Sequence, residues 1–181
     1  MRSKIILTAE ETSYIRDWFR ESLDWSKVRY FQDGIWAAGS SARTLPNRVY
    51  LPGDFVEQQR GSPLWRYILI HETTHVWQFQ NFGLAYIPKS LAEQLRAWLK
   101  TGSGNAAYRF KLFPEQPLRA YGIEQQADIQ ACAALLMNEN NVSFLRRQCT
   151  DWEQQPDEER RKVLHRLHNE LGGTALSTEG T

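Results

Sequence analysis

Cysteine, charge of one sign and long apolar runs are all scarce in this sequence of 181 residues. Two cysteines, Cys132 and Cys149, are too few for a disulfide framework, and their spacing matches no zinc ribbon. The formal net charge of +1 offers no global attraction to nucleic acid or to an anionic membrane. No apolar run approaches the ~18–20 residues that span a bilayer. We therefore expect neither nucleic acid as a partner nor a membrane span.

The amino terminus also lacks the core of a signal peptide. Only three strongly apolar residues follow one another there, from Ile5 to Leu7, and Glu10 and Glu11 follow closely. We therefore expect the protein to be made in the cytoplasm without a conventional signal peptide. Any export would use a specialised secretion system.

Aromatic and apolar residues, in contrast, are plentiful. Hydrophobic residues make up 41% of the chain, charged residues make up 24%, and there are seven tryptophans. This composition is globular, and the length is enough for one domain with its own hydrophobic core. We expect a single domain over residues 1–181, in which residues 174–181 form a flexible tail.

The order of patterns along the chain predicts an α+β fold with more helix than strand. Thr8 and Glu11 form a capping-box pattern before a first helix. Between residues 28 and 51, short β-prone pieces alternate with turn formers, which predicts a small antiparallel sheet or meander; one such piece is Ile35-Trp36. Ser62-Pro63 predicts the start of a helix that runs to about residue 81, with Gly83 near its end. Further helices are expected over about residues 90–100, 122–137 and 156–171.

The pattern with the most chemistry is His71-Glu72-Thr73-Thr74-His75. Histidines four residues apart lie on the same face of a helix, so both imidazoles can bind one metal ion. Glu72 lies about 100° around the helix, beside the ion, where it can take a proton from a bound water molecule. The pattern predicts a zinc site with His71 and His75 as ligands and Glu72 as the catalytic base.

The surroundings of this motif predict a buried helix. Apolar side chains occur nearly all round it, including Leu69, Ile70, Val76 and Trp77. Histidine and glutamate side chains buried there need partners, because an unpaired buried polar group costs free energy. A metal ion would satisfy all three. A buried helix whose histidines merely bind backbone carbonyls is the alternative, but it leaves the joint spacing unexplained.

A catalytic zinc site usually has three protein ligands and one open position, so a third ligand must come from elsewhere. Glu124 and Asp128 are four apart on an expected helix, and two carboxylates on one small apolar face repel unless a cation lies opposite. We expect Glu124 to be the third ligand and Asp128 to accept the free N–H of a ligand imidazole. Two alternatives stay open. In one, both carboxylates are solvated or pair with arginine; in the other, His165 or His168 supplies the ligand from a basic helix face.

The pattern His-Glu-x-x-His with a downstream Glu-x-x-x-Asp resembles the gluzincin group of zinc metallopeptidases. More narrowly, the stretches 69–80 and 121–128 look like the zincin-like effector domains linked to VgrG and Rhs proteins of bacterial type VI secretion. The resemblance implies a zincin-like fold in which the HExxH helix packs against the helix that bears the third ligand. It also implies one zinc ion per chain, delivery as a toxin into a target cell, and a secretion-spike or immunity protein as partner.

The resemblance further implies hydrolysis of peptide bonds in a protein or peptide substrate. In the expected mechanism zinc lowers the pKa of a bound water molecule, and Glu72 takes its proton as the water attacks the carbonyl carbon. Glu72 then passes the proton to the leaving amine. Tyr121, one turn before Glu124, is the first choice for the group that stabilises the oxyanion, ahead of Tyr86 and Tyr108. A place in the core or at the rim is the alternative for Tyr121.

Three other functions fit the same sequence. The zinc chemistry could serve an amidase or peptidase that acts on cell-wall peptides. The metal could instead stabilise a non-catalytic binding module, or an adaptor that binds a secretion partner through its tryptophan-rich N-terminal half. Only three good ligands are apparent and Glu72 is retained beside them, which argues against a structural zinc, since structural sites usually fill all four positions.

Overall fold

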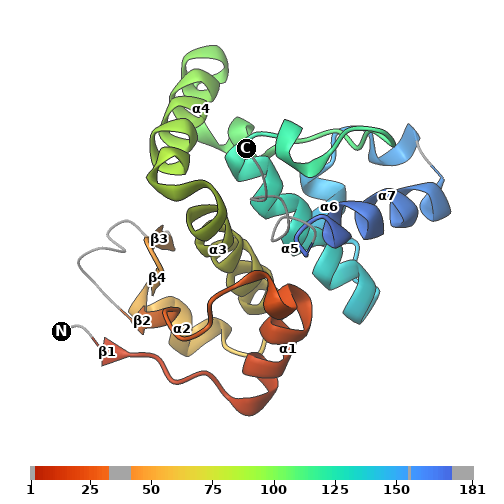
Figure 1. The fold of residues 1–181 in the computed structure, drawn as a ribbon. Helices are drawn as coiled ribbons and strands as arrows, with labels where there is room; N and C mark the ends of the chain where they lie inside the picture. Colours follow the sequence, from red (N-terminus) through yellow and green to blue (C-terminus); the bar gives the residue numbers. More distant parts are fainter. Residues whose placement is uncertain (1–2, 33–41, 155, 173–181) are drawn as a thin grey trace, which may run out of the picture.

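A long central helix, α3, organises the fold, with a small sheet and the first helices on one side and the C-terminal helices on the other (Figure 1). The computed structural model describes residues 3–32, 42–154 and 156–172. The α-helices are α1 (Ala9–Phe19), α2 (Gly53–Gln59), α3 (Pro63–Phe82), α4 (Tyr86–Thr101), α5 (Ile123–Glu139), α6 (Ser143–Gln148) and α7 (Asp157–Asn169). The strands are β1 (Ser3–Lys4), β2 (Arg29–Gln32), β3 (Arg43–Leu45) and β4 (Arg48–Leu51). Short 3-10 segments are η1 (Arg20–Ser22), η2 (Gly83–Ala85), η3 (Gly104–Tyr108), η4 (Leu118–Ala120) and η5 (Trp152–Gln154).

The expected helix starts are confirmed for α1 and α3. The Thr8 hydroxyl accepts the N–H of Glu11, and the Glu11 carboxylate accepts the N–H of Thr8, which completes the capping box. The Ser62 hydroxyl accepts the N–H of Trp65 and so caps α3, and Pro63 occupies the first turn, where its missing N–H costs no hydrogen bond. Gly83 ends α3 with a φ of 66°, a backbone conformation that side chains other than hydrogen disfavour.

Two helices differ in extent from their prediction, and two were not predicted. Helix α4 starts at Tyr86, about four residues early, because Pro88 lies in its first turn and is tolerated there. Helix α7 ends at Asn169, shortly before the expected end. Helices α2 and α6 have only seven and six residues, too few for a clear apolar period.

The prediction of an antiparallel sheet was wrong, because the sheet is mixed. Its order is β1-β2-β4-β3, and the central pair β2 and β4 is parallel while both outer pairs are antiparallel. A tight turn through Asn47, with a φ of 57°, folds β3 back on β4 and leaves the other edge of β4 free to pair with β2. Local patterns cannot specify such a non-sequential pairing. The expected piece at Ile35-Trp36 and the tail 174–181 lie outside the described residues.

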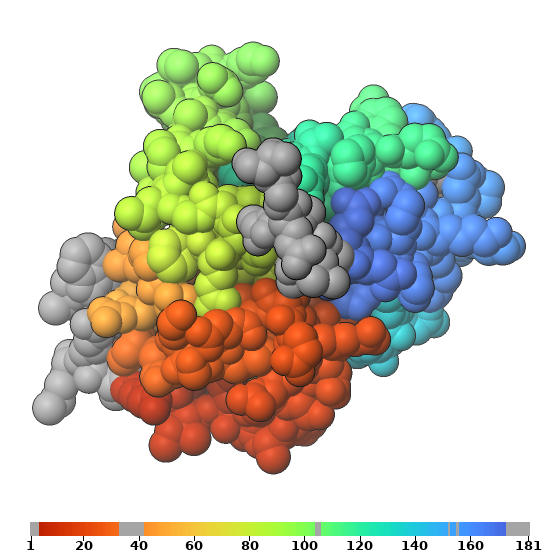
Figure 2. Space-filling model, viewed as in Figure 1, coloured from red at the N-terminus to blue at the C-terminus, as the bar shows by residue number. Residues whose placement is uncertain are grey.

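Helix α3 is buried on every side along its central part, as its sequence predicts. Every residue from Leu69 to Gln78 is buried, and α3 packs against α5, β3, β4 and the N-terminal helices. One cluster of buried apolar residues extends from Ile5 to Leu171, so both halves of the chain share a core. In the space-filling view α4 lies at the surface, and its C-terminal turns project beyond the neighbouring segments (Figure 2). None of the described helices is both long and apolar enough to cross a bilayer.

Candidate metal centre

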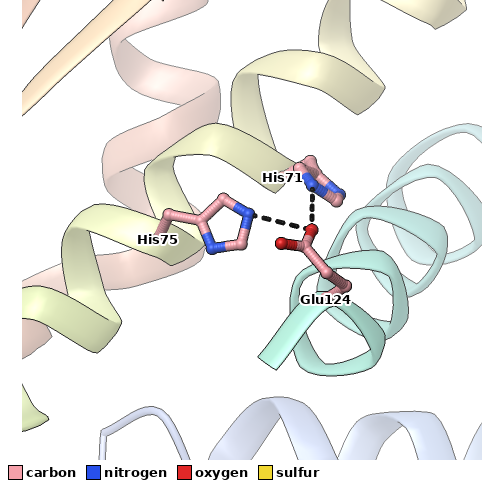
Figure 3. A group of neighbouring side chains, drawn as sticks. All are labelled: His71, His75 and Glu124. Atoms are coloured by element: carbon pink, nitrogen blue, oxygen red, sulfur yellow. Dashed lines mark ion pairs between the residues drawn. The ribbon is translucent and has the colours of Figure 1, made fainter. Parts of the chain in front are cut away.

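Helices α3 and α5 bring three predicted ligands together. His71 and His75 project from α3 toward Glu124 on α5 (Figure 3). The Nε2 atoms of His71 and His75 lie 3.6 Å and 3.4 Å from the same Glu124 oxygen, Oε2. Ligand atoms of the three residues all lie within 4.8 Å of one another, and all three side chains are buried. The expected packing of the HExxH helix against a second ligand-bearing helix is therefore present.

The other nitrogen of each imidazole faces a polar side chain. His71 Nδ1 lies 2.8 Å from Asp128 Oδ1, although the contact is not aligned as a hydrogen bond. His75 Nδ1 lies 2.7 Å from Oε1 of Gln78. Since the Gln78 amide nitrogen donates to the carbonyl of Ile123, its oxygen must face His75, and His75 Nδ1 must be the donor. In each histidine this leaves Nε2 directed at the centre of the cluster, as a metal ligand requires.

The structure places Asp128 where the sequence analysis expected it, next to a ligand imidazole. Its carboxylate is buried at the interface of α3 and α5 and also accepts the hydroxyl hydrogen of Tyr67. Sequence reasoning missed the matching role of Gln78. Its position three residues after His75 would place it on the histidine face, and that spacing was the available clue.

Helix α4 supports Glu124 from the opposite side. Oε1 of Glu124 accepts hydrogen bonds from Ser90 and from Gln94, the latter at 2.9 Å, which leaves Oε2 for the histidines. Burial raises the pKa of the Glu124 carboxyl, but the two imidazoles lower it by more, so it lies well below its usual range. Burial lowers the pKa of His71 and His75, and the carboxylates of Asp128 and Glu124 more than offset this, so both pKa values are raised. The centre thus attracts positive charge.

Glu72 lies beside the cluster and is anchored by the sheet. Its Oε2 accepts a hydrogen bond of 2.7 Å from the hydroxyl of Thr44 on β3. The backbone carbonyl of Thr44 in turn accepts the hydroxyl hydrogen of Tyr86 at 3.2 Å. Thr44 was not predicted as a site residue, because the contact between β3 and α3 follows from the sheet pairing that local patterns miss.

Two cavities meet at this centre. The smaller, of about 280 Å³, is lined by Phe55, Tyr67 and Ile68 beside His71 and Glu72. The larger, of about 400 Å³, lies between β3 and α4 and is lined by Thr44, Leu91 and Glu124 beside both histidines. Glu72 and Tyr108 line both cavities, so the two cavities adjoin at the candidate base and together form the depression at this centre.

The expectation that Tyr121 lies at the centre requires correction. Helix α5 begins at Ile123, so Tyr121 is extended backbone rather than one helical turn before Glu124. Its buried hydroxyl accepts the N–H of Phe113 at 3.1 Å, and it lines neither cavity. The second-choice tyrosines lie at the centre instead: Tyr108 and Tyr86 have ring centroids 5.9 Å and 6.2 Å from the rings of His71 and His75.

Both of these tyrosines are held as hydroxyl donors. Burial raises the pKa of Tyr108, and the nearby carboxylates Glu124, Glu72 and Asp128 raise it further. The same causes raise the pKa of Tyr86 to about 12. At neutral pH each hydroxyl therefore keeps its proton.

The alternative ligands and the cysteines do not join the cluster. His168 packs on Trp18 at a centroid distance of 3.8 Å, and His165 contacts Asn169, so both belong to the surroundings of α7. Cys132 and Cys149 are buried free thiols, and Cys149 donates to Asp151. The structure therefore brings His71, His75 and Glu124 together and leaves His165 and His168 elsewhere.

The donor set fits zinc. Two imidazole nitrogens and one carboxylate are a common set for catalytic zinc, and tetrahedral bonds of ~2.0–2.1 Å place ligand atoms roughly 3.3 Å apart. The separations of 3.4 Å and 3.6 Å measured here are close to that value. These three residues would hold the ion, and a zinc ion with three protein ligands would have a fourth position free for water or substrate.

Comparison with known proteins adds a second line of evidence. No family model matches the chain. A curated relative, the type VI secretion system spike protein VgrG2b of Pseudomonas aeruginosa, is 33% identical over 132 residues, which is 68% of this chain. A solved structure, the effector domain of VgrG2b, superposes with a TM-score of 0.60 at 29% identity and covers 80% of this chain and 82% of that domain.

The chain resembles the VgrG2b effector domain. It spans only 12% of the length of the whole VgrG2b spike protein. The likeness to VgrG2b in sequence and fold confirms the expected resemblance to an effector domain linked to type VI secretion.

Proposed function

We propose that this protein is a zinc-dependent peptidase that acts as an effector of type VI secretion. The observation that carries the proposal is the convergence of His71 Nε2 and His75 Nε2 on Glu124 Oε2, with Glu72 beside them. Three protein ligands and an open fourth position are typical of catalytic zinc rather than structural zinc. The resemblance to the VgrG2b effector domain supports the effector role.

The side chains around the centre have complementary tasks. Zinc, when bound by His71, His75 and Glu124, supplies a Lewis acid that activates water and polarises a carbonyl group. Glu72, held by Thr44, takes the proton of the attacking water and delivers it to the leaving amine. The hydroxyl of Tyr108, which faces both cavities, donates to the developing oxyanion.

The shape of the depression favours a peptide chain as substrate. Because Glu72 lines two adjoining cavities, a polypeptide has room on each side of the cleaved bond if one cavity holds each part of the chain. This arrangement suits cleavage within a chain better than removal of a terminal residue. Phe55, Tyr67 and Ile68 give the smaller cavity one apolar wall, opposite polar lining residues such as Glu72 and Asp128, so a substrate side chain there would meet both kinds of surface.

The proposed effector role also implies partner proteins for this chain and a cell into which it is delivered. By analogy with VgrG2b, the chain would associate with a secretion spike and be delivered into a target cell, and the producing cell would need an immunity protein. The target could be a protein or the peptides of the cell wall, since the same zinc chemistry cleaves both. Expression in the cytoplasm or directed to the periplasm of a bacterial host separates these targets, because only the periplasm exposes the wall.

The decisive experiment combines metal content with a Glu72→Gln variant. We expect about one zinc ion per chain in both the wild type and this variant, and a loss of cleavage or toxicity of ~10²–10⁴-fold in the variant. Glu124→Gln is the companion variant, and it should hold much less zinc. A Glu72→Gln protein that is fully active would rule out the proposed base. A metal-loaded wild type with no hydrolytic activity in either compartment would favour the binding module or adaptor.

A further inference from the structure

Exposed apolar side chains concentrate on one helix. Among the described residues eight large apolar side chains are exposed, and five of them lie on η2 and α4. We name these five the α4 stripe: Leu84, Leu91, Leu95, Trp98 and Leu99, which are 56–69% exposed. Single exposed apolar residues are ordinary, whereas a contiguous row of them marks an interaction surface.

The helix spacing turns the stripe away from the body of the protein. Leu91, Leu95 and Trp98 follow one another at intervals of four and three residues and so share a face. The adjoining side of α4 is committed to the candidate centre, since Ser90 and Gln94 bind Glu124. Figure 1 and Figure 2 show α4 standing out from the rest of the molecule, so the stripe forms a ridge rather than a groove.

Positive charge accompanies the stripe. Lys89, Arg96 and Lys100 are all exposed and lie within about 40° of one another around α4. Arg96 lies about 60° beyond Leu99, on the side away from the larger cavity, and the two lysines lie further around the helix. The one acidic residue of α4, Glu93, faces inward and accepts the N–H of Ile123. The exposed part of the helix therefore combines leucine and tryptophan with basic residues and carries no acidic side chain.

We propose that the α4 stripe docks this protein on an anionic lipid surface. A helix with leucine and tryptophan on one side and lysine and arginine on the other exposed side is typical of helices that lie in the membrane interface, where long basic side chains reach around to the lipid headgroups. A second copy of the chain is a poor occupant, because it would bring the same three positive charges to the contact. A ridge also suits a flat, fluid surface, which needs no matching groove.

The placement has a consequence for the candidate centre. Leu91 belongs to the stripe and also lines the larger cavity. Docking would therefore hold the mouth of that cavity next to the bilayer, where it would meet polypeptides at the membrane surface. This consequence rests on the proposed peptidase function, whereas the docking itself does not.

Sedimentation of the full chain with lipid vesicles tests the docking. The vesicles are phosphatidylcholine alone and an equal mixture of phosphatidylcholine and phosphatidylglycerol, at low ionic strength. We expect the wild type to bind the anionic mixture at least about tenfold more tightly than phosphatidylcholine, and Leu95→Gln/Trp98→Gln to lose about tenfold or more. Arg96→Gln/Lys100→Gln should lose the preference for the anionic mixture. All four positions are exposed, so the fold should be retained.

The control is Ile6→Gln/Phe113→Gln, which removes two exposed apolar side chains that lie elsewhere and should leave binding unchanged. Circular dichroism and zinc content check that each variant is folded. Absence of binding to the anionic vesicles would overturn the proposal, and so would a stripe variant that binds like the wild type. A stripe variant that changes the oligomeric state instead would assign the surface to self-association and equally overturn it.

Discussion

The hydroxyl of Thr44 donates a hydrogen bond of 2.7 Å to Oε2 of Glu72, and so an edge strand of the sheet holds the candidate base beside the metal ligands. Glu72 and Thr44 are 28 residues apart and belong to different elements. This hydrogen bond orients the Glu72 carboxylate. The proposed chemistry therefore depends on the position of β3.

Removal of this hydrogen bond should slow catalysis. We expect Thr44→Val to lower kcat by roughly tenfold or more, because a hydrogen bond to a charged group is worth ~1.5–3 kcal/mol, and to leave zinc content unchanged. Thr44→Ser keeps the hydroxyl and should restore most of the rate. Steady-state kinetics on the three proteins measure this, and equal loss in the serine and valine variants would show that the hydroxyl has no such role.

Replacement of Tyr108 and of Tyr121 by phenylalanine should have clearly different effects. Tyr108→Phe removes the hydroxyl that faces both cavities and should lower kcat by ~10²–10³-fold, the usual effect of losing one oxyanion donor. Tyr121→Phe removes only a hydrogen bond to the N–H of Phe113 and should change stability slightly while activity stays. Kinetics combined with thermal melting distinguishes them. If the Tyr121 variant loses the activity and the Tyr108 variant does not, the structural assignment is wrong.

Gln78 should affect metal affinity through His75. We expect Gln78→Met to weaken zinc binding by ~10–100-fold, because the variant keeps the side-chain volume and loses the acceptor that orients the imidazole. Gln130→Met is the matched control. Gln130 is also fully buried, but its amide donates to the carbonyl of Leu167, a residue far from the ligands in sequence. Competition with a chelator of known affinity gives both values. Equal zinc affinity in the two variants would contradict the prediction.

Glu11 should make stability depend on pH in the acid range. Burial raises the pKa of Glu11, but hydrogen bonds from Arg60, Thr8 and Trp65 lower it by more, so it lies below the ordinary value of 4.5. A carboxyl whose pKa is lowered by folding stabilises the protein above pH 4.5, and this stabilisation is lost as the pH falls through the lower, folded-state pKa.

Glu11→Gln should therefore lower the free energy of unfolding by about 1–2 kcal/mol at pH 7, and the difference from the wild type should shrink as the pH falls below 4.5. Denaturant titrations at several pH values measure it. Glu21→Gln, at an exposed position, should be nearly neutral throughout. A constant difference between wild type and Glu11→Gln across the whole pH range would argue against the ionised carboxylate as its source.

Residues whose role depends on local spacing could be predicted from the sequence. The pair His71 and His75 lies on one helix, so their common face follows from helix geometry alone. Glu124 and Asp128 also share a helix, and the cost of burying two carboxylates together pointed to a cation opposite them. The helix caps at Thr8 and Ser62 are similarly local, since each involves atoms within three residues.

Tyr121 shows where such reasoning fails. Its assignment placed it one helical turn before Glu124, but α5 begins two residues after it and its hydroxyl bonds to Phe113. The first residue of a helix depends on competing caps and on neighbouring segments. The position of a side chain just outside the predicted helix therefore cannot be inferred from helical spacing. The tyrosine that does face the centre, Tyr108, comes from a 3-10 segment with no periodic pattern.

The sequence by itself determined the main parts of the candidate centre: a buried helix with two histidines and a glutamate, and a second helix with a carboxylate pair. Those features arise from helix periodicity and from the cost of burying charge, which act within one element. Only the tertiary structure decided which side chains from other elements meet there: Thr44 from the edge strand β3, and Tyr108 from a 3-10 segment. The exposure of the α4 ridge also depends on the tertiary structure, because a leucine side chain belongs to the surface only when no other element packs on it.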